Sequence, residues 1–408
     1  MSDDQNAQGQ GRHGGGTPPS PERPRYGEYA PGYVPDWQQA APQQLPGPGW
    51  APPPKPGLIP LRPLPFGTLL GAPFQALRRN PRITVGAALL LQGIPSIIVS
   101  VLLASGAALL LTRAANADAA DQATLRAGAV GGVVVLGVLS IVISTVFSAL
   151  LQGVVVAEVA RGTVGDKLTF GALWRAIKGR LGVLIGWTFL FALAWIVALG
   201  LLVGVIIALA ALGGTAGVIG AVLAGLFGGI GLLVLAVRVN TKLAIVPSAI
   251  VLERLPLRAA VARSWRLTTG YFWKTFGLIA LIGVIVYSVT QVIAIPFGIL
   301  GAMVGAVFDP TGASTAGTDP TTQLIVSQLG VNLLSSVVTA VVGAIGSVLQ
   351  TAAVALLYID LRMRKEGLDL QLVRYVEGRQ AGQDLPDPYL APAPGAAPPA
   401  APAAWPGG

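Results

Sequence analysis

Long apolar blocks separated by short polar segments dominate the chain between residues 63 and 378. A helix needs about 20 apolar residues to cross the hydrocarbon core of a bilayer, and each block is at least that long and carries no charged side chain. Residues 181–237 are uncharged over a length too great for one such helix, so Gly213 and Gly214 are predicted to form a turn. The predicted spans are 83–112, 127–157, 181–212, 215–237, 275–308 and 323–359.

A short basic segment precedes each pair of spans. In the third segment Leu257, Val261 and Trp265 recur every four residues, which places them on one face of a helix. Aligning Phe74, Trp174 and Trp265 superimposes the three segments. We therefore expect three repeats, each made of an interfacial amphipathic helix and two spans. The alternative is that the segments are only the basic flanks that membrane helices need on their cytosolic side.

The composition supports a membrane protein. Hydrophobic residues make up 53% of the chain and charged residues 11%, whereas soluble domains carry about 25% charged residues. The predicted fold class is an all-α polytopic integral membrane protein with six transmembrane helices. Residues 63–378 form its membrane domain, flanked by a disordered Pro/Gly/Gln-rich tail (1–62) and a disordered Pro/Ala-rich tail (379–408).

The basic residues are distributed unevenly between the two sides of the predicted spans. Of the 27 Lys and Arg residues, only Arg113 and Arg126 fall on the side opposite to the termini. Because basic residues collect in cytoplasmic loops, both termini are predicted to be cytoplasmic. Arg outnumbers Lys 21 to 6, and Ala, Gly and Val are abundant, which suggests a bacterial protein of the cytoplasmic (inner) membrane.

The residues for most site chemistries are missing. The chain has no cysteine, and its one histidine, His13, lies in the N-terminal tail. The predicted spans contain no Asp, Glu, Lys, Arg or His, whereas proton relays and ion pathways in membranes usually depend on such groups. We predict no catalytic residue, metal site or cofactor, and no nucleic-acid partner for the positive charge.

The basic segments supply candidate contacts to lipid headgroups, since cations near the surface are attracted to an anionic leaflet. The alternative is that these cations only anchor the helices at the membrane surface. The candidates are Arg78, Arg79, Arg175, Lys178, Arg180, Arg258, Arg263 and Arg266.

Polar residues gather in the sixth predicted span. Asn332, Ser335, Ser336 and Thr339 lie at three- and four-residue spacings and share a helical stripe. They are candidates to line a wet cavity, together with polar residues of span five (Thr290, Gln291) or of span one (Gln92, Ser96). The alternative is that they form hydrogen bonds between helices.

Small residues recur every four positions from the predicted turn into span four: Gly213, Gly217, Ala221, Gly225 and Gly229. Such a stripe lets two helices approach closely. We expect it to pack span three against span four; the alternative is a dimer interface.

Two stretches resemble a known family. Residues 245–276 (IVPSAIVLERLPLRAAVARSWRLTTGYFWKTF) and 355–370 (ALLYIDLRMRKEGLDL) are similar to the membrane domain associated with glycerophosphoryl diester phosphodiesterases. The resemblance implies a polytopic helical domain over about residues 63–378 and no established activity. The phosphodiesterase chemistry of those enzymes belongs to a separate barrel with His and acidic metal ligands, so it is not expected here.

These patterns favour a non-enzymatic membrane protein, a scaffold or a lipid-interacting protein. Its expected partners are membrane lipids, anionic ones included, and a protein bound through the tail at residues 1–62. The alternative is a permease-like transporter of an apolar or zwitterionic solute.

Overall fold

The computed structural model describes residues 57–118, 120–308, 320–383 and 385–390, with the side chains of 301–302 and 304–335 excluded. The described residues are helical and contain no β-strand. In chain order the elements are α2 (Phe66–Arg79), α3 (Pro81–Ala88), η1 (Leu89–Gly93), α4 (Ile94–Ala115), α5 (Gln122–Thr163), α6 (Phe170–Ile177), η2 (Lys178–Arg180), α7 (Leu181–Ala211), α8 (Gly214–Leu243), α9 (Val246–Leu252), α10 (Leu257–Thr268), α11 (Phe272–Phe308), α12 (Pro320–Glu366) and α13 (Leu368–Gln380).

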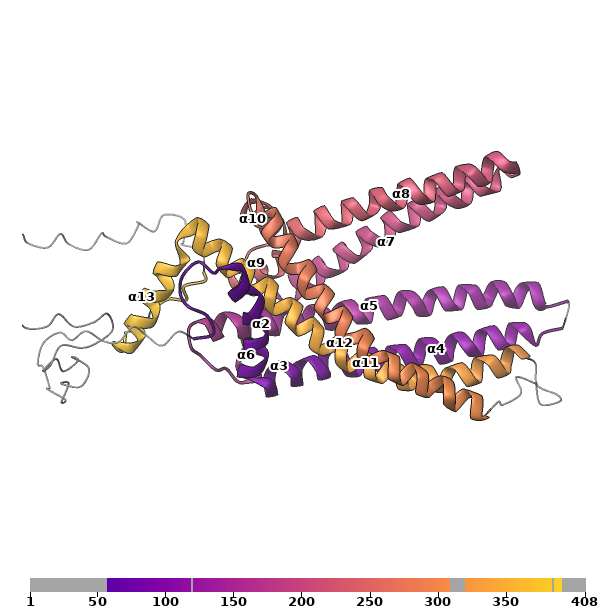
Figure 1. The fold of residues 1–408 in the computed structure, drawn as a ribbon, viewed down its shortest axis with the longest axis horizontal. Helices are drawn as coiled ribbons and strands as arrows, with labels where there is room; N and C mark the ends of the chain where they lie inside the picture. Colours follow the sequence, from indigo (N-terminus) through magenta and orange to yellow (C-terminus); the bar gives the residue numbers. More distant parts are fainter. Residues whose placement is uncertain (1–56, 119, 309–319, 384, 391–408) are drawn as a thin grey trace, which may run out of the picture. The chain divides into compact units, whose positions relative to one another are not determined.

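The long helices pair in sequence order into three hairpins: α4 with α5, α7 with α8, and α11 with α12 (Figure 1). Six helices of the described chain are long and apolar enough to cross a membrane. The turn predicted in the second hairpin is confirmed, because Gly213 and Gly214 both adopt positive φ angles, of 70° and 64°. A residue with a Cβ atom would be strained in that conformation.

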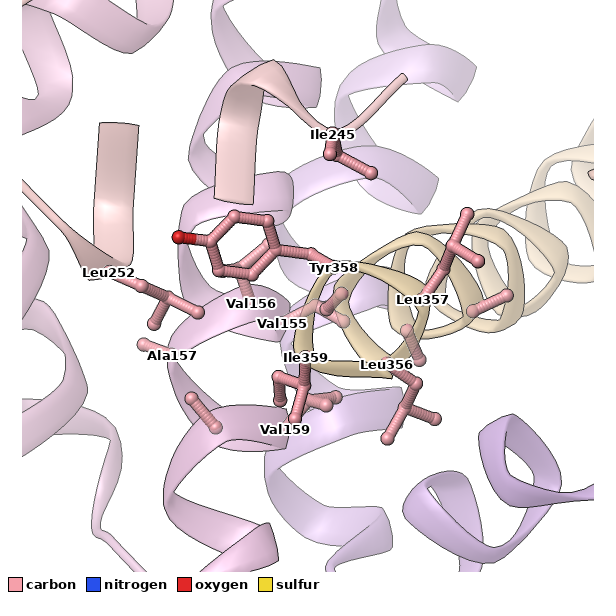
Figure 2. Close-up of a cluster of buried hydrophobic side chains, with 14 of the residues drawn as sticks. Val155, Val156, Ala157, Val159, Ile245, Leu252, Leu356, Leu357, Tyr358 and Ile359 are labelled. Carbon is pink, nitrogen blue, oxygen red and sulfur yellow. The ribbon is translucent and has the colours of Figure 1, made fainter. Parts of the chain in front are cut away.

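One end of the hairpins is joined by a tightly packed group of apolar side chains, here termed the basal core. It centres on the last turns of α5, on α9 and on the C-terminal half of α12, where Tyr358 and Ile359 are fully buried (Figure 2). Val155 and Val156 of α5 and Ile245, which immediately precedes α9, pack in the same cluster. The basal core is thus built from segments distant in sequence, which fixes the three hairpins to one another.

The three predicted interfacial segments are helical. They correspond to α2, α6 and α10, and each buries an apolar side, such as Leu69 in α2 or Leu173 in α6. Helix α10 ends at Thr268 and is followed by Gly270 with φ 86°. Whether the three units are repeats of one another stays a prediction, since similar elements alone do not establish common descent.

Several boundaries differ from those predicted. Helix α8 continues past Arg238 to Leu243. Helix α12 runs without a break through Asp360 to Glu366, where ion pairs compensate the charges. Ordered packing also extends into both predicted tails, where Ile59 and Tyr389 are 2% exposed. The remaining tail residues, 1–56 and 391–408, and the loop at 309–319 lie outside the described residues.

Candidate functional site

A pocket of about 500 Å³ lies among α5, α7, α8 and η1, next to the start of α9. Its volume is within the range of about 300–1,000 Å³ that is typical of small-molecule sites. We call it the hairpin pocket. Its lining consists of Gln92, Ser144, Thr145, Ser148, Gln152, Trp187, Thr188, Phe191, Ala192, Asn240, Leu243, Ala244 and Pro247.

Helix α5 supplies a polar stripe to this pocket. Ser144, Ser148 and Gln152 are spaced four residues apart and therefore share one face of the helix. The Gln152 amide donates a hydrogen bond from Nε2 to Ser148 Oγ over 3.3 Å. The side-chain carbonyl of Gln152 stays available as an acceptor, so the stripe offers both hydroxyl and amide groups to a ligand.

The opposite polar contribution comes from an irregular turn. Residues Leu89–Gly93 form the π-helical turn η1, which ends two residues before Pro95; this proline has no backbone N–H to continue the α-helical bonding. Such turns are frequent at functional sites. Gln92 lies in this turn, and its Oε1 is buried without a hydrogen-bond partner among the described residues. A buried amide oxygen left unpaired costs about 1–3 kcal/mol, so a ligand donor at this point would recover that energy.

Helix α7 closes the pocket with aromatic rings. Trp187 is buried and stacks on Phe191, with ring centroids 5.2 Å apart. Thr188 beside them donates its hydroxyl to the backbone carbonyl of Leu184 at 3.1 Å. Across the pocket, Asn240 of α8 donates its amide to the carbonyl of Ala236 at 2.9 Å, which leaves its side-chain carbonyl as an acceptor.

The chemistry of the lining is therefore neutral. Eight side chains with hydroxyl, amide or indole groups surround the space, and none of the lining residues is ionisable. Hydrogen-bonding groups next to flat aromatic faces suit a molecule with polar groups and no net charge. In the described part of the chain, no three His, Asp or Glu residues are grouped so as to hold a metal ion.

Charged side chains gather instead at the basal core. Arg263 of α10 pairs with Glu253 at 2.9 Å and with Glu366 at 2.5 Å, and Tyr358 donates its hydroxyl to Glu253. Burial alone would lower the pKa of the Arg263 guanidinium, but the bonds and charges of the two glutamates raise it above its ordinary value. Arg362, itself buried, joins the same network through Glu366 at 3.0 Å.

A second buried carboxylate holds three segments together. Asp360 of α12 accepts the backbone N–H of Leu64 at 2.7 Å, the Lys274 ammonium at 2.5 Å and the Arg364 guanidinium at 3.1 Å. Charges removed from water are tolerated only with such partners. Both networks thus join α12 to distant segments of the chain.

The eight predicted headgroup residues divide into two groups. Arg79 donates to the carbonyl groups of Gly162 and Asp166, and Arg263 is held by its two glutamates, so both guanidinium groups bond within the protein. The other six form no ion pair within the described part of the chain, and their contact with lipid stays a prediction. Arg78, Arg175, Lys178, Arg258 and Arg266 are exposed, and Arg180 is partly exposed.

The described residues of the polar stripe predicted in the sixth span do not line the hairpin pocket. The side chains of Asn332 and Ser335 lie outside the described residues, and Ser336 and Thr339 are not among the lining residues. Of the residues that the sequence offered for a cavity, only Gln92 lines this one. The i, i+4 spacing of Ser144, Ser148 and Gln152 is the sequence signal that could have indicated this pocket.

Comparison with known proteins identifies a family whose function is unknown. The family described as "Domain of unknown function (DUF7847)" matches residues 66–361, from the start of α2 to the last turns of α12. No curated protein and no solved structure matches the chain. Since the match covers well over half of the chain and includes the whole hairpin pocket, the chain belongs to this family of unknown function.

Proposed function

We propose that the protein is a permease-like membrane protein that binds an uncharged or zwitterionic polar solute in the hairpin pocket. In this proposal six helices cross the bacterial inner membrane, both termini are cytoplasmic, and three repeats of an interfacial helix with two spans form the domain. The single observation that carries the function is a neutral, polar-lined pocket among helices that are long and apolar enough to cross a membrane.

Two properties of the pocket support a neutral solute. Unpaired polar groups at membrane depth are costly, so Gln92 Oε1 favours a partner that donates a hydrogen bond. The lining contains no ionisable side chain, so it cannot neutralise a solute that carries a net charge. A bare ion would lose its hydration shell in the pocket and gain no charged partner there. A zwitterion or a polyol meets both conditions.

Transport is tested in vesicles that contain the full chain. Stopped-flow light scattering follows the entry of a panel of neutral solutes, with glycerol as a small polyol and glycine as a small zwitterion. We expect at least one solute of the panel to enter faster with the wild-type protein than with the double variant Q92L/N240L. Ser105→Ala, on the exposed part of α4 outside the pocket, is the matched control. If no solute distinguishes wild type from the double variant, the proposal is wrong.

A second candidate function is a non-enzymatic, lipid-interacting scaffold. It is favoured by the exposed cations of the three short basic helices, such as Arg175 and Arg258, which have no acidic partner in the described chain. A protein partner bound through residues 1–62, and kinship with the glycerophosphoryl diester phosphodiesterase membrane domains, belong to this proposal. Its test is co-purification, in which deletion of residues 1–55 removes a bound protein and leaves the lipid content unchanged.

A further inference from the structure

A groove separate from the hairpin pocket runs between α8 and the start of α11. It has a volume of about 560 Å³ and is lined by Leu233, Val234, Val237, Arg238, Lys242, Phe272 and Trp273. We call it the cationic groove. One part of its wall is aliphatic, and the part toward the end of α8 carries two cations beside two aromatic rings.

The two cations lack acidic partners. Arg238 and Lys242 are four residues apart on α8, a spacing at which like charges repel. The Lys242 ammonium contacts the Thr269 hydroxyl at 3.3 Å and lies 5.3 Å from the centre of the Trp265 ring. Neither residue forms an ion pair with any described carboxylate, whereas the nearby Arg263 has two.

A third cation strengthens the positive charge at this end of the groove. The Lys365 ammonium of α12 is held by the backbone carbonyls of Arg266 and Thr269, at 2.8 and 2.7 Å. Both the Lys365 ammonium and the Arg238 guanidinium repel the positive charge of the Lys242 ammonium. Three cations converge here without a compensating anion among the described residues, so the groove favours a ligand that supplies negative charge.

The apolar half of the groove sets the second requirement. Leu233 and Val234 are more than 60% exposed, and Trp273 is 78% exposed, the largest value among the described large apolar residues. Exposed Trp side chains are typical of the boundary between hydrocarbon and headgroups, where the indole ring is anchored. A ligand that fits both halves has an acyl chain and an anionic headgroup.

We propose that the cationic groove is a binding site for an anionic phospholipid, with the phosphate at Arg238 and Lys242 and an acyl chain along Leu233, Val234 and Val237. Trp273 covers the glycerol region at the boundary. This proposal does not depend on transport through the hairpin pocket, because the cationic groove and the hairpin pocket share no residue. None of its residues belongs to the eight headgroup candidates named from the sequence.

The test measures lipids retained by the full chain. The protein is reconstituted in vesicles of equal phosphatidylglycerol and phosphatidylcholine, extracted in mild detergent, and analysed by native mass spectrometry. Because each cation near a membrane surface is worth about 1 kcal/mol, the double variant R238Q/K242Q is expected to bind phosphatidylglycerol roughly tenfold or more weakly. The charge-matched control R62Q/R374Q, which removes two exposed cations elsewhere, is expected to retain it.

A second variant tests the aliphatic half independently of charge. Val234→Trp fills the groove at an exposed position that tolerates a larger side chain, and it is expected to reduce phosphatidylglycerol retention while the protein still elutes as one species. The proposal is overturned if R238Q/K242Q retains as much phosphatidylglycerol as R62Q/R374Q. It is also overturned if wild type retains both lipids equally, or if Val234→Trp has no effect.

Discussion

The C-terminal half of α12 and the α7–α8 hairpin are both apolar enough to cross a membrane, yet their surroundings are opposite. Half of the most apolar stretch of α12 within Ser336–Glu366 is buried inside the protein, whereas none of the corresponding stretches of α7 or α8 is. Helix α12 packs against α2, α4, α5 and α11, while α7 and α8 pack against each other, with α7 also contacting α5 and α8 also contacting α10 and α11. Apolar composition therefore does not separate a helix that packs inside the protein from one whose apolar surface stays exposed.

What separates the two regions is the polar chemistry at their ends. Helix α12 ends in Asp360, Arg362 and Glu366, whose charges are matched by Lys274, Glu253 and Arg263 of other segments. Helix α8 ends in Arg238 and Lys242, whose charges are matched by none of the described acids. The difference suggests that the basal core is stabilised by the protein itself and the hairpin by its surroundings.

The largest expected effect comes from breaking the basal core at Asp360. The substitution Asp360→Asn leaves the partly buried Lys274 ammonium beside a neutral group, and it should lower the free energy of unfolding by about 3–5 kcal/mol. Unfolding by SDS titration in mild detergent measures the loss. Asp369→Asn, on α13 and without an ion pair in the described chain, is the control; equal effects of the two variants would contradict the account.

The next effect comes from the C-terminal segment that follows α13. Tyr389 is buried, and burial raises the pKa of its phenol above the usual value. Its backbone carbonyl accepts a bond from Arg362 at 2.9 Å. A chain ending at Gln380 should therefore lose about 3 kcal/mol of stability.

The matched control for this truncation is a chain that ends at Leu390, which keeps Tyr389 and its bonds. Thermal unfolding of the two truncated chains should differ by several degrees. Equal midpoints would mean that the packing of Tyr389 contributes nothing.

Within the hairpin, two neighbouring glycines give a sharper comparison. A Cβ atom on Gly228 would lie 2.4 Å from a methyl group of Leu202, whereas one on Gly229 meets no atom within 4 Å. Gly228→Ile should destabilise the hairpin by about 1–3 kcal/mol, and Gly229→Ile should have little effect. The same SDS titration measures both; a large loss with Gly229→Ile would instead support a dimer interface on that face.

The smallest effect on stability is expected in the hairpin pocket, where the effect on function should be large. Gln92→Leu removes a buried oxygen that has no partner, so stability should stay equal or rise by about 1 kcal/mol. Solute entry in the vesicle assay should fall. A destabilised Gln92→Leu protein would show that this amide serves the fold and not a ligand.

The sequence predicted much of this fold because its strongest signals are local. The uncharged blocks predicted the long helices. Gly213 and Gly214 predicted a turn that the backbone angles confirm. The predicted interfacial segments are the helices α2, α6 and α10. The length of an apolar block and the residues of a turn are properties of one continuous segment, so they can be recognised without knowing which other segments it contacts.

The sites were harder to predict because they depend on contacts between distant segments. Nothing in the sequence near Asp360 indicates that Leu64 and Lys274 bind it. Arg263 was predicted to face lipid headgroups, yet Glu253 and Glu366 hold it inside the protein. The hairpin pocket likewise joins Gln92 to residues of four other helices, and its π-helical turn has no clear sequence signature beyond Pro95.

The central claim is that the hairpin pocket is a wet, polar space within an otherwise lipid-facing bundle. Because the chain has no cysteine, single cysteines at Thr188 and Leu190 test it directly. The two positions are about 3 Å apart along α7, so depth cannot separate them, but Thr188 lines the pocket and Leu190 is 51% exposed outside it. We expect an uncharged, hydrophilic thiol reagent to label Thr188→Cys in vesicles many times faster than Leu190→Cys. Equal rates, or faster labelling of Leu190→Cys, would contradict the account.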